Sequence, residues 1–112
     1  MTYTKGASIE TAETDGIPAA VAAAESAGLA VVVVGDSMRT CGEWGDRAEL
    51  DLTGGQLALL EAVAATKTPT VLVLVTGRTA TFGKNNAVLS NVSAIFSAFR
   101  PGEKEGEKEG ER

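Results

Sequence analysis

Two short runs of aliphatic residues constrain the fold of this chain more than any other feature of its sequence. Residues 29–34 and residues 71–75 are almost entirely Val, Leu and Ala, and glycines follow them at Gly35 and Gly77. A run that is apolar at every position is typical of a strand buried on both faces, as central parallel strands are. The two runs therefore predict an α/β protein with a parallel sheet.

Stretches of helical character separate these runs. Pro18 suits a first helical position, and residues 19–27 are rich in Ala. Thr53 and Gln56 have the spacing of a capping box, and apolar residues recur at helical spacing from there to about Thr66. This alternation of strand and helix is the pattern of βαβ units.

Weaker signals complete the predicted architecture. Residues 94–99 predict a third parallel strand, residues 2–4 a short first strand, and residues 86–89 a short turn of helix. We therefore expect a three-layer α/β sandwich, with a mostly parallel, flavodoxin-like sheet of about four strands, over residues 1–101. Residues 102–112 repeat Gly, Glu and Lys, and such a low-complexity charged tail is expected to be disordered.

Composition excludes several classes of function. The formal net charge of −5 argues against binding to nucleic acid or to an anionic membrane. The chain has no His, so triads and dyads that use His are excluded within it, and its single Cys41 cannot form an internal disulfide. No stretch has the layout of a signal peptide or approaches about 20 apolar residues. We expect a soluble chain of unknown localisation, with no metal and no cofactor.

Candidate functional residues lie where ligands gather in open parallel sheets, in the loops that follow the strands. The loop at residues 35–52 is long and charged, and it contains Asp36, Arg39, Cys41, Glu43, Trp44, Asp46 and Arg47. Composition alone favours a solvated loop in which neighbouring charges pair locally. It leaves Glu43 as a general acid or a surface carboxylate, and Trp44 as a sugar-stacking ring or a cover for the sheet. Asp36 is expected to cap the loop backbone, and Arg78 to brace the neighbouring loop.

Several stretches together resemble one known family. Residues 42–47 read Gly-Glu-Trp-Gly-Asp-Arg and residues 50–56 read Leu-Asp-Leu-Thr-Gly-Gly-Gln. With the segments at residues 3–6, 31–35, 71–78 and 94–103, in this order, they resemble the C-terminal α/β domain of family 3 glycoside hydrolases of the β-glucosidase or β-xylosidase type. The resemblance covers nearly all of residues 2–103.

The resemblance implies a two-carboxylate retaining mechanism on β-linked sugars. It maps the acid/base onto Glu43. Trp44, Asp46 and Arg47 of the same loop are the candidate substrate-binding residues. The family's nucleophile is an Asp on an N-terminal (β/α)₈ barrel of roughly 250 residues, which this chain is too short to contain. We therefore expect a fragment of a retaining exo-β-glycosidase that is inactive alone.

Departures from the family pattern leave other interpretations open. Thr53 and Thr79 stand where the family usually has Pro, and the charged tail replaces the family's continuation after Glu103. The alternatives are an excised or designed folding module without a ligand, and a weak sugar-binding domain that uses the loop around Trp44. The missing closing elements would leave sheet surface uncovered, so self-association is also expected.

Overall fold

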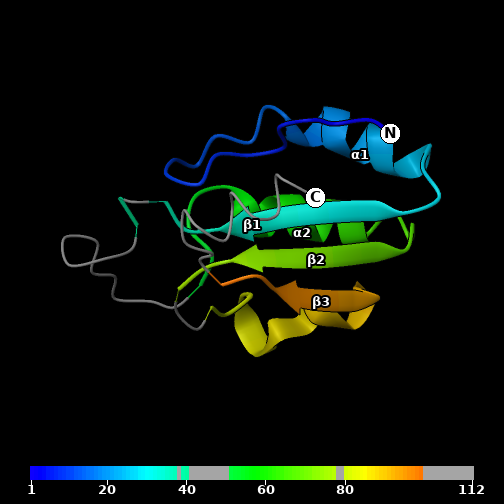
Figure 1. Cartoon of the computed structure of the whole chain (residues 1–112). Coiled ribbons are helices and arrows are strands. Elements are labelled where there is room, and N and C mark those ends of the chain that lie inside the picture. Colours follow the sequence, from blue (N-terminus) through cyan, green and yellow to red (C-terminus); the bar gives the residue numbers. More distant parts are fainter. Residues whose placement is uncertain (38, 41–50, 78–79, 100–112) are drawn as a thin grey trace, which may run out of the picture.

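The computed structural model of the chain describes residues 1–37, 39–40, 51–77 and 80–99. Its elements, in chain order, are α1 (Ile17–Glu25), β1 (Ala30–Gly35), α2 (Gln56–Ala64), β2 (Thr70–Val75), the 3₁₀ helix η1 (Lys84–Asn91) and β3 (Ala94–Ser97) (Figure 1). This alternation confirms the predicted α/β class, and each of the three strands falls on a run that the sequence assigned to a strand.

The three strands form one parallel sheet in the order β1-β2-β3. Ala30 of β1 pairs with Thr70 of β2, and Val71 of β2 pairs with Ala94 of β3. Each strand therefore lies beside the strand that precedes it in the chain. Because all three run in the same direction, they end at one side of the sheet, called here its carboxyl end (left in Figure 1).

One face of the sheet packs against the helices and forms the core. Val32 and Val34 of β1 and Leu72 of β2 are buried on this face. They belong to a cluster of buried apolar residues completed by Ala24, Leu52, Leu60, Val63, Ala64, Phe82 and Val88. Leu60 and Leu72 are fully buried, so α2 and β2 lie at the centre of this core.

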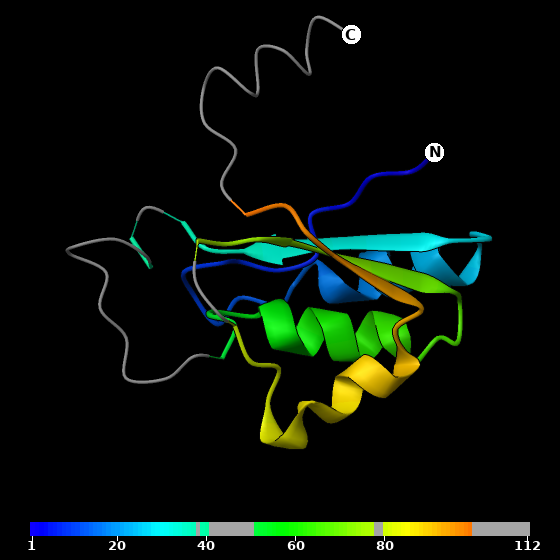
Figure 2. The same ribbon diagram turned by 60° about the horizontal axis from the view of Figure 1, so that its bottom comes forward.

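All three helices lie on the same side of the sheet (Figure 2). Right-handed crossovers that add each strand beside the previous one, always in one direction, place the helices that they contain on one face, which accounts for α2 and η1. The described residues therefore form two layers. The second helical layer of the expected three-layer sandwich is not found among them.

Several element boundaries differ from those expected. Residues 2–4 form no strand, and Tyr3 is largely exposed. The first helix begins at Ile17 after Gly16, with Pro18 in its first turn, and it ends at Glu25, before the expected residue 27. The turn expected at residues 86–89 is part of the longer η1. The predicted charged tail lies outside the described residues.

The opposite face of the sheet is apolar and open. Val31 and Val33 of β1 are 58% and 61% exposed, and Phe96 of β3 is 62% exposed. The register aligns Val33, Val73 and Phe96 in one row across the three strands. Since both faces of a purely parallel sheet are normally covered, a bare apolar face of this kind favours association.

We propose that the isolated chain self-associates through this face. Three strands of up to six residues give the open face an area of roughly 300 Å². A stable complex buries about 800 Å² of surface on each partner. We therefore expect a weak, concentration-dependent dimer in sedimentation experiments, and we expect Val33→Lys to abolish it. Ala22→Lys, which adds the same charge at an exposed position of α1, should leave the dimer intact. A chain that stays monomeric at millimolar concentration would refute self-association.

Candidate functional site

The candidate site lies at the carboxyl end of the sheet, where β1 and β2 end side by side. Gly35 pairs with Val75, and the backbone N–H of Asp36 donates to the Val75 carbonyl oxygen at 3.1 Å. A Cβ atom on Gly35 would collide with that carbonyl, so this close approach requires glycine. The connections after β1 (residues 36–55) and after β2 (residues 76–83) thus leave from adjacent strand ends, as predicted.

The residues predicted to act on substrate lie outside the described residues. These are the acid/base candidate Glu43 and the sugar-binding candidates Trp44, Asp46 and Arg47; Cys41 and Arg78 lie outside as well. Their roles therefore stay predictions. The structure does describe both ends of the connection that contains them, at residues 36–37, 39–40 and 51–55.

Gln56, the first residue of α2, bonds directly to the end of β1. Its Oε1 accepts the backbone N–H of Gly35 at 2.7 Å, and its Nε2 donates to the Gly35 carbonyl oxygen at 2.8 Å. The Gln56 side chain is buried, so its amide satisfies a buried N–H and C=O as a neighbouring strand would. The predicted capping box is wrong, because Gly55 is the N-cap, no side chain caps the helix, and Gln56 is engaged with β1.

Two carboxylates bond the ends of the first connection to the second. Asp36, at the start, accepts a hydrogen bond from the hydroxyl of Thr76. Asp51, near the other end, accepts one from the hydroxyl of Thr81 and a second from the backbone N–H of Gly83 at 3.1 Å. The two residues that flank the segment containing Glu43, Asp36 and Asp51, are therefore both hydrogen-bonded to the connection that follows β2.

Hydrogen bonding shifts the titration of Asp51. The Thr81 hydroxyl, and then the Gly83 N–H, lower the pKa of Asp51 below its ordinary value of 3.8, and partial burial opposes them more weakly. Both donors stabilise the ionised form of the carboxyl group. Asp51 therefore holds its two partners as a carboxylate at neutral pH.

The N-terminal segment at residues 8–13 covers the start of α2. The backbone N–H of Gly55 donates to the Ser8 carbonyl oxygen at 3.0 Å. Gly54 has a positive φ of 62°, and a Cβ atom there would collide with the carbonyl of Ser8. The two glycines before Gln56 are thus explained by a left-handed backbone and by close packing of this segment.

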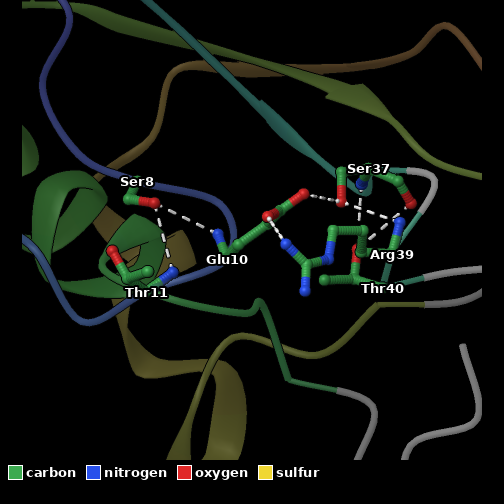
Figure 3. Close-up of polar contacts among 6 residues, drawn as sticks. All are labelled: Ser8, Glu10, Thr11, Ser37, Arg39 and Thr40. Atoms are coloured by element: carbon green, nitrogen blue, oxygen red, sulfur yellow. Dashed lines mark hydrogen bonds and ion pairs between the residues drawn. The ribbon is translucent and has the colours of Figure 1, made fainter.

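The same segment contacts the start of the first connection through Glu10. In Figure 3 the Glu10 side chain extends toward Ser37 and Arg39, while Ser8 and Thr11 lie on the opposite side of Glu10. Segments from four parts of the chain therefore meet at the carboxyl end of the sheet. They comprise residues 8–13, 35–37 with 39–40, 51–56, and 76–77 with 80–83.

Sequence reasoning found only part of this arrangement. Asp36 was expected to cap its own loop, and this role stays a prediction; the bond that its carboxylate accepts from Thr76 was not expected. The contacts of Asp51, Thr81 and Glu10 were not anticipated. A usable signal was present, since aspartates stand near both ends of the first connection and threonines follow β2 in the next one.

In the described ranges, no group of three or more acidic or Cys residues is placed to hold a metal ion. No helix in the same ranges is long and apolar enough to cross a membrane.

Comparison with known proteins gives a consistent result. Residues 2–110 match the family model described as the glycosyl hydrolase family 3 C-terminal domain. A β-xylosidase from Formosa agariphila is 39% identical over 102 residues, which cover 91% of this chain. A solved β-glucosidase involved in saponin metabolism, from intestinal bacteria, superimposes with a TM-score of 0.70 at 31% identity over 93% of this chain.

The matched proteins are much longer than this chain. It spans 14% of the length of the β-xylosidase and 16% of the solved β-glucosidase chain. The similarity therefore concerns one part of those proteins.

The bond between Gln56 and Gly35 leads to a test of stability. Gln56→Leu leaves two buried backbone groups without their partner, so we expect a loss of about 2–4 kcal/mol in the free energy of unfolding. Thr53→Ala should cost less than about 0.5 kcal/mol, because the hydrogen bond described for the Thr53 hydroxyl is a long one, from Nε2 of Gln56 at 3.4 Å. Urea denaturation of both variants would measure this difference. If Thr53→Ala lowered the free energy of unfolding more than Gln56→Leu does, the capping box of Thr53 and Gln56 would be supported after all.

A second test concerns the pKa of Asp51. Because folding lowers this pKa, the carboxylate stabilises the fold above about pH 3.8, and this contribution disappears as pH falls through the lowered value. We expect Thr81→Val to raise the pKa of Asp51 toward 3.8 and to reduce the loss of stability below that pH. A ¹³C NMR titration of the Asp51 carboxyl group would measure the pKa. An unchanged value in Thr81→Val would show that the hydroxyl does not cause the shift.

Proposed function

Since the chain belongs to the glycosyl hydrolase family 3 C-terminal domain family, we propose that it supplies the acid/base loop to a retaining exo-β-glycosidase. The proposed substrate is a β-linked glucoside or xyloside, in keeping with the names of the similar proteins. The nucleophile belongs to a (β/α)₈ barrel domain that these 112 residues do not contain. The proposal assigns one of the two carboxyl groups of the reaction to this chain.

The observation that supports this role is the attachment of both ends of the connection between β1 and α2. Asp36 and Asp51 each accept the hydroxyl of a threonine from the connection that follows β2. A general acid must be positioned within hydrogen-bonding reach of the leaving oxygen, so the segment that bears it needs fixed ends. The carboxyl end of a parallel sheet is also where ligands bind in open α/β folds.

The proposed chemistry uses Glu43 in two protonation states. As a carboxylic acid it protonates the glycosidic oxygen while the nucleophile forms the glycosyl-enzyme. As a carboxylate it then removes a proton from the water that hydrolyses this intermediate. Retention requires the two carboxyl groups to lie about 5–5.5 Å apart. Trp44 is proposed to stack on the sugar ring, and Asp46 and Arg47 to bond its hydroxyls.

A chimera provides the test. The 102 aligned residues of the Formosa agariphila β-xylosidase would be replaced by their counterparts from this chain, and Glu43→Gln compared with Glu13→Gln as control. We expect Glu43→Gln to lower kcat/KM by about 10²-fold or more on alkyl xylosides, which need protonation of the leaving group. The kcat/KM of Glu43→Gln on dinitrophenyl xyloside should fall much less, because this leaving group needs no protonation. Azide should restore turnover of the activated substrate by forming the glycosyl azide.

Equal losses on all leaving groups, with no rescue by azide, would exclude Glu43 as the acid/base. The isolated chain should release no product from aryl β-glycosides, because the nucleophile and the sugar pocket lie elsewhere. Saturable turnover by the isolated chain would contradict this expectation. Shifts of the Trp44 and Glu43 NMR signals on addition of glucose, without any catalytic role in the chimera, would favour the weak sugar-binding domain instead.

A further inference from the structure

Glu10 connects the N-terminal segment to a turn that lies 27 residues later in the chain. Its Oε1 accepts a hydrogen bond from the hydroxyl of Ser37 at 2.8 Å, and its Oε2 lies 3.5 Å from Nη1 of Arg39 (Figure 3). Both partners belong to the first few residues after β1. The carboxylate of Glu10 is thus the point at which two remote segments meet.

Glu10 is itself held in place by its own segment. The hydroxyl oxygen of Ser8 accepts the backbone N–H groups of Glu10, at 3.2 Å, and of Thr11, at 3.1 Å. The Ser8 backbone in turn bonds to Glu13 and to Gly55 at the start of α2. The carboxylate therefore extends from a turn that is attached to the start of α2.

The residues that Glu10 contacts also form a unit. Thr40 Oγ1 accepts the backbone N–H of Ser37 at 2.9 Å, and Ser37 Oγ accepts the N–H of Arg39 at 3.1 Å. The N–H of Thr40 donates to the Ser37 carbonyl oxygen at 3.2 Å. The Ser37 hydroxyl accepts within this turn and donates to Glu10, so it links the Glu10 carboxylate to the hydrogen bonds of the turn (Figure 3).

We propose that Glu10 is a positioning residue for the acid/base: it fixes the orientation of the turn at Ser37, Arg39 and Thr40, from which the chain continues to Glu43. This inference rests on the function proposed above for Glu43. In this proposal Glu10 acts through the turn and does not contact the substrate.

The hydrogen bond outweighs the ion pair in this role. The side chains of Arg39 and Glu10 are 83% and 36% exposed, and exposed ion pairs contribute little because water screens them. The bond from the Ser37 hydroxyl, at 2.8 Å, is charge-assisted because its acceptor is a carboxylate. Gln at position 10 keeps an oxygen acceptor for Ser37 and loses only the charge, so Glu10→Gln should preserve most of the effect.

The test uses the 112-residue chain with three variants, observed by NMR. Glu10→Ala should shift the amide signals of Ser37, Arg39 and Thr40, and also the indole signal of Trp44, the single Trp of the chain. Glu10→Gln should leave the Trp44 signal near its original position. Glu13→Ala is the matched control, since it removes the same charge from the same segment, and the Glu13 side chain has no hydrogen-bond or ion-pair partner among the described residues. Melting temperatures should agree within a few degrees among all variants.

Shifts confined to residues 37–40 in Glu10→Ala, with Trp44 unchanged, would overturn the proposal, because the contact would then be merely local. Equal shifts of the Trp44 indole signal in Glu10→Ala and Glu13→Ala would also overturn the proposal. In the chimera, Glu10→Ala should lower kcat on alkyl xylosides about tenfold with little change in KM, less than the 10²-fold that a 1 Å misplacement can cost.

The kinetics separate failure of this inference from failure of the proposed function. If azide rescues Glu43→Gln while Glu10→Ala keeps full activity, Glu10 does not position the acid/base and the proposed function stands. If Glu43→Gln shows no azide rescue, the function proposed for Glu43 fails, and with it the catalytic part of this inference.

Discussion

The arrangement at the carboxyl end of the sheet depends on one side-chain amide. At the last residue of β1, the Gln56 amide bonds both backbone polar groups of Gly35. Leaving the buried N–H and C=O of Gly35 unpaired would cost free energy, so this pairing holds the end of β1 and the start of α2 together. The first connection is consequently a closed loop whose two ends meet at this amide. The Asp36 and Asp51 contacts can form because this junction places both ends beside the next connection.

Carboxylate–hydroxyl pairs recur around this junction. Asp36 with Thr76, Asp51 with Thr81, and Glu10 with Ser37 each join segments that lie far apart in the sequence. Short Ser, Thr and Asp side chains lose less rotamer entropy on ordering than Lys or Arg would. Such pairs can thus fix loop ends near the surface, where an ion pair between long side chains gives little net stability.

The predictable part of this protein is the part that follows a periodic pattern. Uniformly apolar runs predicted β1 and β2 because parallel strands are buried in a characteristic way. The position of the site at the carboxyl end followed from topology alone. The role of Gln56 was missed because its spacing from Thr53 fits a local cap equally well, and only the tertiary approach of β1 decides between the two. The contacts of Glu10 and Asp51 likewise depend on remote segments, and a local pattern contains no information about them.

The agreement between strand order and chain order also has a consequence for how the protein is made. The bond between Gln56 and Gly35 closes only 21 residues of chain, and each strand pairs with the one synthesised just before it. Short closures cost little entropy, and local topologies fold quickly. As the polypeptide leaves the ribosome, α2 can dock on β1 before β2 exists, and β3 can join a sheet that is already formed. The open apolar face is then present from the earliest stage, and apolar surface that is exposed during folding favours aggregation until it is covered.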